Sequence, residues 1–211
     1  MSITVQISES LQKGKLKDVK ELVNKALEEG LSPEVILNEG LLAGMDVIGG
    51  KFKRNEVYVP EVLIAARAMN AGAEILKPKL VEAGVKSIGK VVLCTVKGDL
   101  HDIGKNLVKM MLEGKGLEVV DLGIDISEDK VVAAVKEHNP DIVALSALLT
   151  TTMGEQKVVI EALKEAGVRD QVKVMIGGAP VTQAYADEIG ADAFTPDAAT
   201  CGEVAKSFVV A

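Results

Sequence analysis

The feature that most constrains the fold is a regular alternation of short apolar runs and amphipathic helical patterns after residue 89. We expect strands near residues 90–96, 117–122, 141–147, 172–176 and 192–195, and helices near 104–114, 127–138, 152–167, 181–189 and 199–209. Strands that alternate with helices through short links form βαβ crossovers, which need parallel pairing. The pattern therefore predicts a doubly wound α/β domain, Rossmann-like or flavodoxin-like, with a five-stranded parallel sheet covered on both faces.

The first 88 residues carry helical patterns only. Apolar residues recur at helical spacing in Leu16–Leu27 and again in Val62–Leu80, and a short amphipathic segment runs from Ile3 to Leu11. Ser32-Pro33-Glu34 supplies an N-cap, a first-turn proline and an acid for a further helix, which we expect to end at Gly49-Gly50. Four helices with short connections favour a four-helix bundle.

A glycine-flanked segment at residues 84–89 separates the two patterns, and we interpret it as a linker. It predicts a helical domain of residues 1–88, placed as a cap, and an α/β domain of residues 89–211.

The net charge and the aromatic content limit the classes of molecule that the chain is expected to bind. The formal net charge is −7, whereas contact with nucleic acid or anionic membranes needs clustered lysine and arginine. Aromatic residues make up 2% of the chain and tryptophan is absent, so stacking platforms for single-stranded nucleic acid are not expected. We therefore expect no nucleic-acid or membrane partner, and a small molecule or another protein instead.

The cysteines and the N-terminus bear on location. Cys94 lies in an apolar run and Cys201 in a late helix, so the two offer neither a disulfide framework nor a close-spaced metal site. The segment 1–10 lacks the basic start and apolar core of a signal peptide, and no segment has the roughly 20 apolar residues that span a bilayer. These observations favour a cytoplasmic protein.

One short motif carries chemistry. Asp99-Leu-His101-Asp-Ile-Gly104 directly follows the apolar run at residues 90–96 and precedes a helical pattern. His101 should therefore lie at the carboxyl edge of a parallel sheet, where open α/β folds bind ligands. A carboxylate two residues before a histidine can fix its ring for metal ligation. In isolation, a histidine that merely bonds the backbone is an equally good interpretation. The other histidine, His138, ends a helix before a proline and is assigned no ligand role.

Two further elements are expected at the same edge. Ser146-Ala-Leu148 ends the third strand and Gly177-Gly178 ends the fourth. Each has an ordinary alternative, since Ser146 can cap a helix, Leu148 can belong to the core, and paired glycines occur at sharp turns. Together with the histidine loop they describe a slot that admits a flat or extended ligand.

The order and spacing of these three elements resemble the signature of cobalamin-binding domains that hold the cofactor base-off with a histidine on cobalt. The helical part is also similar, through Gly44-Met45-Asp46-Val47-Ile48-Gly49 and Val59-Pro60-Glu61-Val62, to the cap domain of methionine synthase and of small corrinoid proteins. The resemblance covers nearly the whole chain.

The resemblance implies a role for individual residues. His101 would ligate cobalt and act as the catalytic centre together with Asp99, which accepts the proton on the other ring nitrogen, and Ser146, which extends the network. Further cofactor contacts would come from Gly98, Asp102, Ile103, Gly104, Leu148, Thr150, Gly177, Gly178 and Ala198. Phe52, Val59 and Val62 match residues that shield the upper face of the corrin, although plain bundle core is an equally good interpretation of them. Helix capping also remains open for Asp102 and Thr150.

As a function, the resemblance implies a corrinoid protein that carries a methyl group on cobalt. The cofactor, cobalamin or a related cobamide, would alternate between methylcob(III)alamin and cob(I)alamin, and the Asp99–His101 pair would take up a proton when His101 leaves the metal. One partner, a substrate-specific methyltransferase, would deliver the methyl group from a methylamine, methanol or a methoxylated aromatic. A corrinoid:folate or corrinoid:thiol methyltransferase would remove it, and a reductive activase would restore the cofactor.

Two alternatives stay open from the sequence. One is a cobalamin-dependent sensor or regulatory binding protein, and the other, ranked lower, is the small subunit of an adenosylcobalamin mutase. In the leading interpretation the chain is a methyl-carrier component of a methyltransferase system rather than a complete enzyme.

Overall fold

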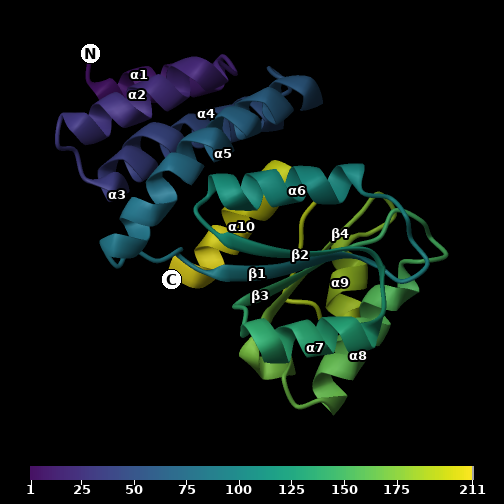
Figure 1. The fold of residues 1–211 in the computed structure, drawn as a ribbon. Coiled ribbons are helices and arrows are strands. Elements are labelled where there is room, and N and C mark those ends of the chain that lie inside the picture. The colour runs from purple at the N-terminus through teal and green to yellow at the C-terminus, as the bar shows by residue number, and fades with distance from the viewer. Residues whose placement is uncertain (211) are drawn as a thin grey trace. The chain divides into compact units, whose positions relative to one another are not determined.

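The structure, a computed structural model, describes residues 1–210 and consists of two compact units (Figure 1). One unit comprises Met1–Ser87 together with Gly114–Gly116, and the other comprises Ile88–Glu113 and the chain from Leu117 onward. The division between Ser87 and Ile88 lies within the glycine-flanked segment 84–89.

The first unit is a bundle of helices. Its helices are α1 (Ile3–Gln12), α2 (Leu16–Glu28), α5 (Val59–Glu82) and a continuous stretch made of α3 (Pro33–Val35), η1 (Ile36–Leu42) and α4 (Ala43–Lys53). Each of them contributes completely buried apolar side chains, among them Ile7, Val23, Leu41 and Leu76. The helical N-terminal part is thus confirmed, and its stability derives from packing of the apolar faces.

The stretch from Pro33 to Lys53 begins as expected but ends later. The Ser32 hydroxyl accepts a hydrogen bond from Val35 N at 3.3 Å, which is an N-cap. The expected end at Gly49-Gly50 is wrong, because the helix continues to Lys53 and Asn55 follows in the left-handed region at φ 57°. A helical glycine costs about 1 kcal/mol, which is less than the gain from burying an apolar side chain such as Ile48.

The segment η1 is a π-helix, and the sequence pattern did not predict it. Here and one turn further on, α1 approaches very closely. A Cβ atom on Gly40 would lie 3.1 Å from Ile7 Cγ2, and one on Gly44 would lie 3.2 Å from the backbone oxygen of Ser8. The two glycines therefore permit the close contact between α1 and this helix.

The second unit contains a five-stranded sheet. Its strands are β1 (Lys90–Val96), β2 (Glu118–Ile126), β3 (Ile142–Ser146), β4 (Lys173–Gly177) and β5 (Ala193–Phe194). They follow the order β2-β1-β3-β4-β5, and all four pairings are parallel. This is the flavodoxin-like order of a doubly wound fold, so the predicted fold class is confirmed.

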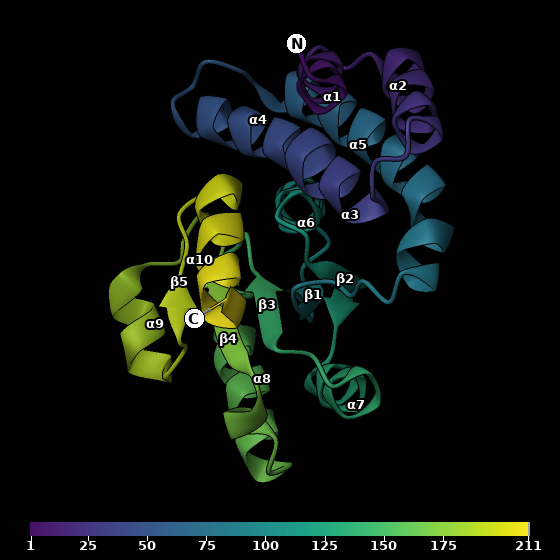
Figure 2. The ribbon, with the colours of Figure 1, turned by 90° about the vertical axis from the view of Figure 1, so that its left-hand side faces the viewer.

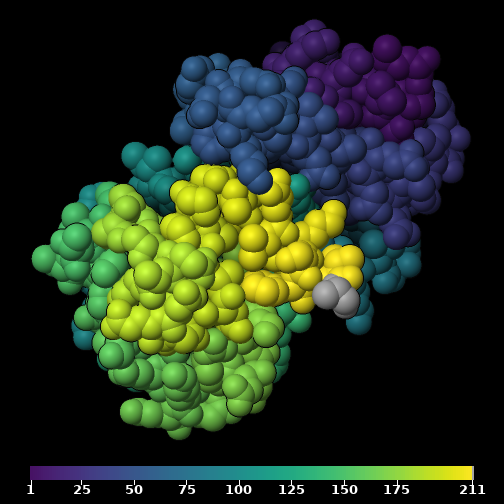
Figure 3. Space-filling view, turned by 180° about the vertical axis from the view of Figure 1, so that it is seen from behind, coloured from purple at the N-terminus to yellow at the C-terminus, as the bar shows by residue number. Residues whose placement is uncertain are grey.

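Helices cover both faces of this sheet (Figure 2). Val92 and Cys94 pack in one buried cluster with α7 (Glu128–His138), α8 (Gly154–Glu165) and α9 (Gln183–Ile189), whereas Val91 and Leu93 pack in another with α6 (Ile103–Gly114) and α10 (Ala198–Val210). Alternate residues of a strand point to opposite faces, which is why neighbours in β1 join different clusters. Figure 3 shows α10, in yellow, and α9, in yellow-green, at the surface of this unit.

The carboxyl ends of β1, β3 and β4 lie side by side and position the site. Thr95 of β1 is aligned with Ser146 of β3, and Ser146 is aligned with Gly177 of β4. The strand order reverses between β1 and β3, and ligands of doubly wound folds bind at such a switch point. The three motifs of the sequence therefore meet at this edge.

Within residues 1–210, no helix has the length and apolar character needed to cross a lipid bilayer.

Candidate functional site: a carboxylate-backed histidine at the sheet edge

The loop between β1 and α6 carries the histidine. Gly98 has a φ of 78°, and this left-handed turn brings Asp99 N within 3.2 Å of Val96 O, to which it donates. The Thr95 hydroxyl donates to His101 O at 2.8 Å. These two hydrogen bonds connect the end of β1 to the loop, and they fix the backbone position of His101.

The Asp99 carboxylate is completely buried and fully bonded. Its Oδ1 accepts from His101 N at 3.1 Å and is hydrogen-bonded to His101 Nδ1 at 2.7 Å. Its Oδ2 accepts from Leu148 N at 2.8 Å and from Thr152 Oγ1 at 2.7 Å. One carboxylate therefore ties the histidine loop to the segment that follows β3.

These contacts determine the charge of Asp99. Burial raises the pKa of the carboxyl group, but the hydrogen bonds from Thr152, His101 and the Leu148 amide outweigh it and hold the pKa well below its usual range. Asp99 is therefore ionised at neutral pH. An ionised carboxylate can only accept, so His101 Nδ1 carries the hydrogen and Nε2 keeps its lone pair in the neutral ring.

The His101 ring is half exposed, with 50% of its side-chain surface accessible. Leu100 and Ile103, on either side of it in the sequence, are 68% and 72% exposed, which is high for apolar side chains. A histidine with a fixed tautomer and apolar neighbours suits an apolar ligand that offers a metal to one nitrogen.

Gly104 and Gly178 are glycines for different physical reasons. Gly104, in the first turn of α6, has no positive φ, and a Cβ there would meet nothing within 4 Å. The fold does not require glycine at this position, whereas a ligand lying against the helix would. Gly178 has a φ of 134°, and a Cβ there would lie 1.7 Å from Ala147 O. Gly178 is therefore needed by the backbone itself, whatever binds beside it.

Ser146 lies at the end of β3 and is partly buried, and its hydroxyl is not among the partners of Asp99. The hydroxyl that extends the aspartate–histidine network is that of Thr152, which is 7% exposed. The sequence shows three consecutive threonines at 150–152, and spacing alone did not indicate which one turns inward. Leu148 contributes its backbone N–H, while the residue as a whole is 41% exposed.

The remaining predicted contacts divide between the units. Asp102 directly precedes α6: its backbone oxygen accepts the first backbone bond of that helix from Asn106 N at 2.8 Å, and its carboxylate accepts from the Asn106 side-chain amide at 3.3 Å. Thr150 is exposed, and Ala198 is buried at the start of α10. The three residues expected to shield a corrin belong to the helical unit: Phe52 and Val59 are partly buried and Val62 completely. Their shielding role stays a prediction.

A buried ion pair beside the loop was not predicted from the sequence. Lys105, 3% exposed, donates to the two carboxylate oxygens of Asp121 at 2.8 and 2.7 Å. Burial raises the pKa of the Asp121 carboxyl group, but the hydrogen bond and charge of Lys105 outweigh this and lower the pKa. The pair joins the first turn of α6 to β2, and so supports the loop that carries His101.

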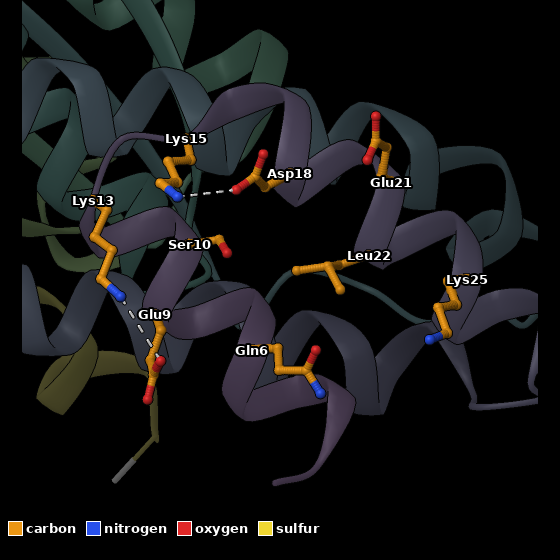
Figure 4. Close-up of a pocket in the computed structure, with 9 residues that line it drawn as sticks. All are labelled: Gln6, Glu9, Ser10, Lys13, Lys15, Asp18, Glu21, Leu22 and Lys25. Atoms are coloured by element: carbon orange, nitrogen blue, oxygen red, sulfur yellow. Dashed lines mark ion pairs between the residues drawn. The ribbon is translucent and has the colours of Figure 1, made fainter.

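The helical unit has a surface hollow of about 400 Å³ between α1 and α2 (Figure 4). Its lining is dominated by charged side chains. Some of them form solvent-exposed ion pairs, Lys13 with Glu9 at 3.9 Å and Lys15 with Asp18 at 3.4 Å. Exposed pairs of this kind contribute little free energy, and their groups are solvated. The charged side chains of this hollow are therefore typical of a solvated surface.

Together the fold and the site define a class of protein: a doubly wound domain that presents one carboxylate-backed histidine at the ligand-binding edge of its sheet. Comparison with known families identifies the ligand. Residues 89–205 match a family model described as a B12 binding domain, and residues 5–77 match a second model with the same description. The chain belongs to this family of B12-binding corrinoid proteins, and its cofactor is cobalamin or a related corrinoid.

Individual relatives are similar over most of their length. The trimethylamine corrinoid protein of Methanosarcina barkeri is 49% identical over 177 residues, which cover 83% of this chain and 82% of that protein. A corrinoid protein of Desulfitobacterium hafniense is 42% identical over 212 residues, covering 99% and 98%. Among solved structures, the methanol:cobalamin methyltransferase complex of Methanosarcina barkeri matches with a TM-score of 0.88 and 33% identity, over 98% of this chain and 79% of that one.

Proposed function

We propose that this protein carries a methyl group between two methyltransferases on the cobalt of a corrinoid that is bound base-off, with His101 as the lower axial ligand. The observation that carries the proposal is the orientation of His101, whose Nδ1 is engaged by Asp99 at 2.7 Å while its ring remains half exposed. A single protein nitrogen suits a metal whose equatorial ligands are supplied by a macrocycle. When bound, the corrinoid supplies a cobalt that accepts a methyl cation in its reduced state and releases it to a nucleophile.

In this proposal the residues of the chain bind and orient the cofactor. Leu100 and Ile103 give an apolar support to the macrocycle, and the absence of a side chain at Gly104 leaves it space. Ser146 and Gly177, which are neighbours across β3 and β4, would hold the base of the cofactor and its nucleotide tail. Further cofactor contacts are assigned to Gly98 and Asp102 beside the corrin, and to Leu148, Thr150, Gly178 and Ala198 along the nucleotide tail.

The network also handles a proton. While Nε2 is committed to the metal, Asp99 holds the hydrogen on Nδ1. An imidazole nitrogen that holds no metal can take up a proton, and the ionised Asp99 would stabilise an imidazolium formed on His101. Thr152 and the Leu148 amide keep Asp99 ionised in both states, because they donate to its second oxygen.

The partners follow from the carrier role. The relative named for trimethylamine is 49% identical, and the structure named for methanol is 33% identical, so a methylamine-type methyltransferase is the first donor enzyme to test, before methanol and methoxylated-aromatic types. The same proposal includes a folate- or thiol-dependent acceptor methyltransferase and a reductive activase.

A cytoplasmic location is supported by Cys94 and Cys201, which are both free thiols.

The test is titration of the cofactor-free protein with hydroxocobalamin, followed by absorption. The wild-type protein should bind and change the spectrum to that of a cofactor whose own base has left the cobalt. His101→Ala should bind more weakly, with a different spectrum, and His138→Ala is the matched control because it removes the other histidine of the chain. If His101→Ala and the wild type have the same affinity and spectrum, the axial-ligand assignment is refuted.

Methyl transfer is tested with the same material. After reduction, addition of methylamine and a methylamine-type methyltransferase should convert the spectrum to that of the methylated cofactor, and subsequent addition of the acceptor enzyme should reverse it. A cofactor that is adenosylated and photolabile instead would favour a sensor or a mutase subunit.

A further inference from the structure

Asp125 is the one side-chain-bearing residue of the described β-strands with a left-handed backbone. Its φ is 53°, and Gly123 shortly before it has a φ of 95°. The register between β1 and β2 shifts in this region, between Cys94 and Val96, so the regular ladder is interrupted. A residue with a side chain pays a free-energy cost in this conformation and keeps it only where its surroundings hold it there.

The turn directs two groups of Asp125 at the histidine loop. Its backbone N–H donates to Asp99 O at 3.1 Å, and its carboxylate Oδ1 accepts from Gly98 N at 2.7 Å. Both partners belong to the short segment that precedes His101. The carboxylate is not used as the cap of the next helix, because α7 begins at Glu128 and has Ser127 at the N-cap position.

Asp99 is thereby anchored from two sides. Its carboxylate is held from the β3 side by Leu148 N and Thr152, and its carbonyl is held from the β2 side by Asp125. Asp99 in turn fixes the His101 ring through Nδ1. Such support matters for a loop that presents a metal ligand, because loss of the hydrogen bonds that orient a ligating residue weakens metal binding.

We propose that Asp125 is a positioning residue, which clamps the histidine loop to the end of β2 and so sets the strength of the His101–metal bond. The inference rests on the proposed function, because it concerns the axial ligation assigned to His101. It adds a residue outside the three motifs of the sheet edge.

Three substitutions of Asp125 distinguish the effect of its left-handed backbone conformation from the effect of its side-chain hydrogen bond. Asp125→Asn keeps an acceptor oxygen and tolerates the left-handed region, Asp125→Gly keeps the conformation but loses the acceptor, and Asp125→Ala loses both. Asp129→Ala is the matched control, since Asp129 is an exposed acid in the first turn of α7. The readouts are the dissociation constant for hydroxocobalamin, the axial-nitrogen splitting in the electron paramagnetic resonance spectrum of the bound Co(II) form, and the urea midpoint of the cofactor-free protein. For the resonance spectra the protein is produced with histidine labelled with the heavy nitrogen isotope, so that a histidine nitrogen on cobalt gives a doublet and the nitrogen of the unlabelled base gives a triplet.

We expect Asp125→Asn and Asp129→Ala to bind as the wild type does. Asp125→Gly should bind about fivefold more weakly, the value of one hydrogen bond, and Asp125→Ala about tenfold or more. The fraction with a histidine nitrogen on cobalt should fall in the same order. Asp125→Gly relieves backbone strain while losing a bond, so its urea midpoint should stay close to that of the wild type.

Two outcomes would overturn the inference: wild-type affinity and splitting in Asp125→Gly, or a loss of binding in the series that merely follows the loss in urea midpoint. The wild type and His101→Ala decide the proposed function separately. If these two show the same axial nitrogen, the proposed function fails, and the positioning role of Asp125 is refuted with it.

Discussion

Replacing Thr152 by valine removes a hydroxyl that donates to the buried Asp99 carboxylate at 2.7 Å and keeps the shape of the side chain. A hydrogen bond to a charged group contributes about 1.5–3 kcal/mol. Asp99 retains its bonds to His101 and Leu148 N, so we expect a loss of about 2 kcal/mol in the free energy of unfolding of the α/β unit.

The pH dependence of this loss follows from the pKa of Asp99, which is lowered in the folded protein. A carboxyl group whose pKa is lowered by folding stabilises the folded state fully when the pH is above its pKa in the unfolded chain, about 3.9. This stabilisation is lost as the pH falls through the pKa that the group has in the folded protein. Without the Thr152 donor the folded pKa is less depressed. The difference between wild type and Thr152→Val should therefore be complete near neutral pH and shrink as the pH falls below about 4.

The assay is urea unfolding followed by tyrosine fluorescence. The chain has two tyrosines, and in a Tyr58→Phe background the signal comes from Tyr185, whose hydroxyl donates to Met153 O in the α/β unit. Thr151→Val is the control, because Thr151 is exposed and its substitution should change the free energy by no more than about 0.5 kcal/mol. If Thr152→Val is no less stable than Thr151→Val, or if its loss persists unchanged in acid, the account of the Asp99 network is refuted.

Further predictions concern the glycines and the cysteines. Gly178→Ala should lower the free energy of unfolding by more than about 3 kcal/mol, because a Cβ would lie 1.7 Å from Ala147 O; a stable, normally folded variant in urea titration would contradict this. Gly104→Ala should be neutral or stabilising by up to about 1 kcal/mol, yet weaken hydroxocobalamin binding, and unaltered binding would remove the argument for a ligand at that turn. Burial raises the pKa of Cys94 to about 12 and that of Cys201 to about 11, so iodoacetamide should modify both thiols in urea but neither in the native protein at neutral pH, as mass spectrometry would show.

Much of the fold was predictable because it follows from local periodicity. The alternation after residue 89 predicts four of the five strands to within one residue at each end, as for β1 at Lys90–Val96, and parallel pairing follows from the crossovers. The predicted end of β2 at residue 122 is wrong, because the strand continues to Ile126 through Gly123 and Asp125, whose positive φ values the apolar pattern does not show. The edge at which His101 lies follows from the same reasoning. These features need no knowledge of which side chains touch.

The features that the sequence did not predict depend on tertiary contacts. The helix continues through Gly49-Gly50 because the bundle buries its apolar face, and the π-helical segment at Ile36–Leu42 lies where α1 packs closely. The choice of Thr152 over Ser146 in the network depends on how the chain turns after β3. The Lys105–Asp121 pair joins residues that are remote in the sequence, and no motif marks either of them.

The central claim, that His101 replaces the cofactor's own base on cobalt, is tested most directly by isotope labelling. The protein is produced with histidine labelled with the heavy, spin one-half nitrogen isotope, loaded with unlabelled cobalamin and reduced to the Co(II) form. Electron paramagnetic resonance should show each cobalt line split by the axial nitrogen into a doublet, and the His138→Ala protein should give the same doublet. A triplet, the pattern of the ordinary isotope in the unlabelled base, would show that the base stays on the metal and would contradict the account.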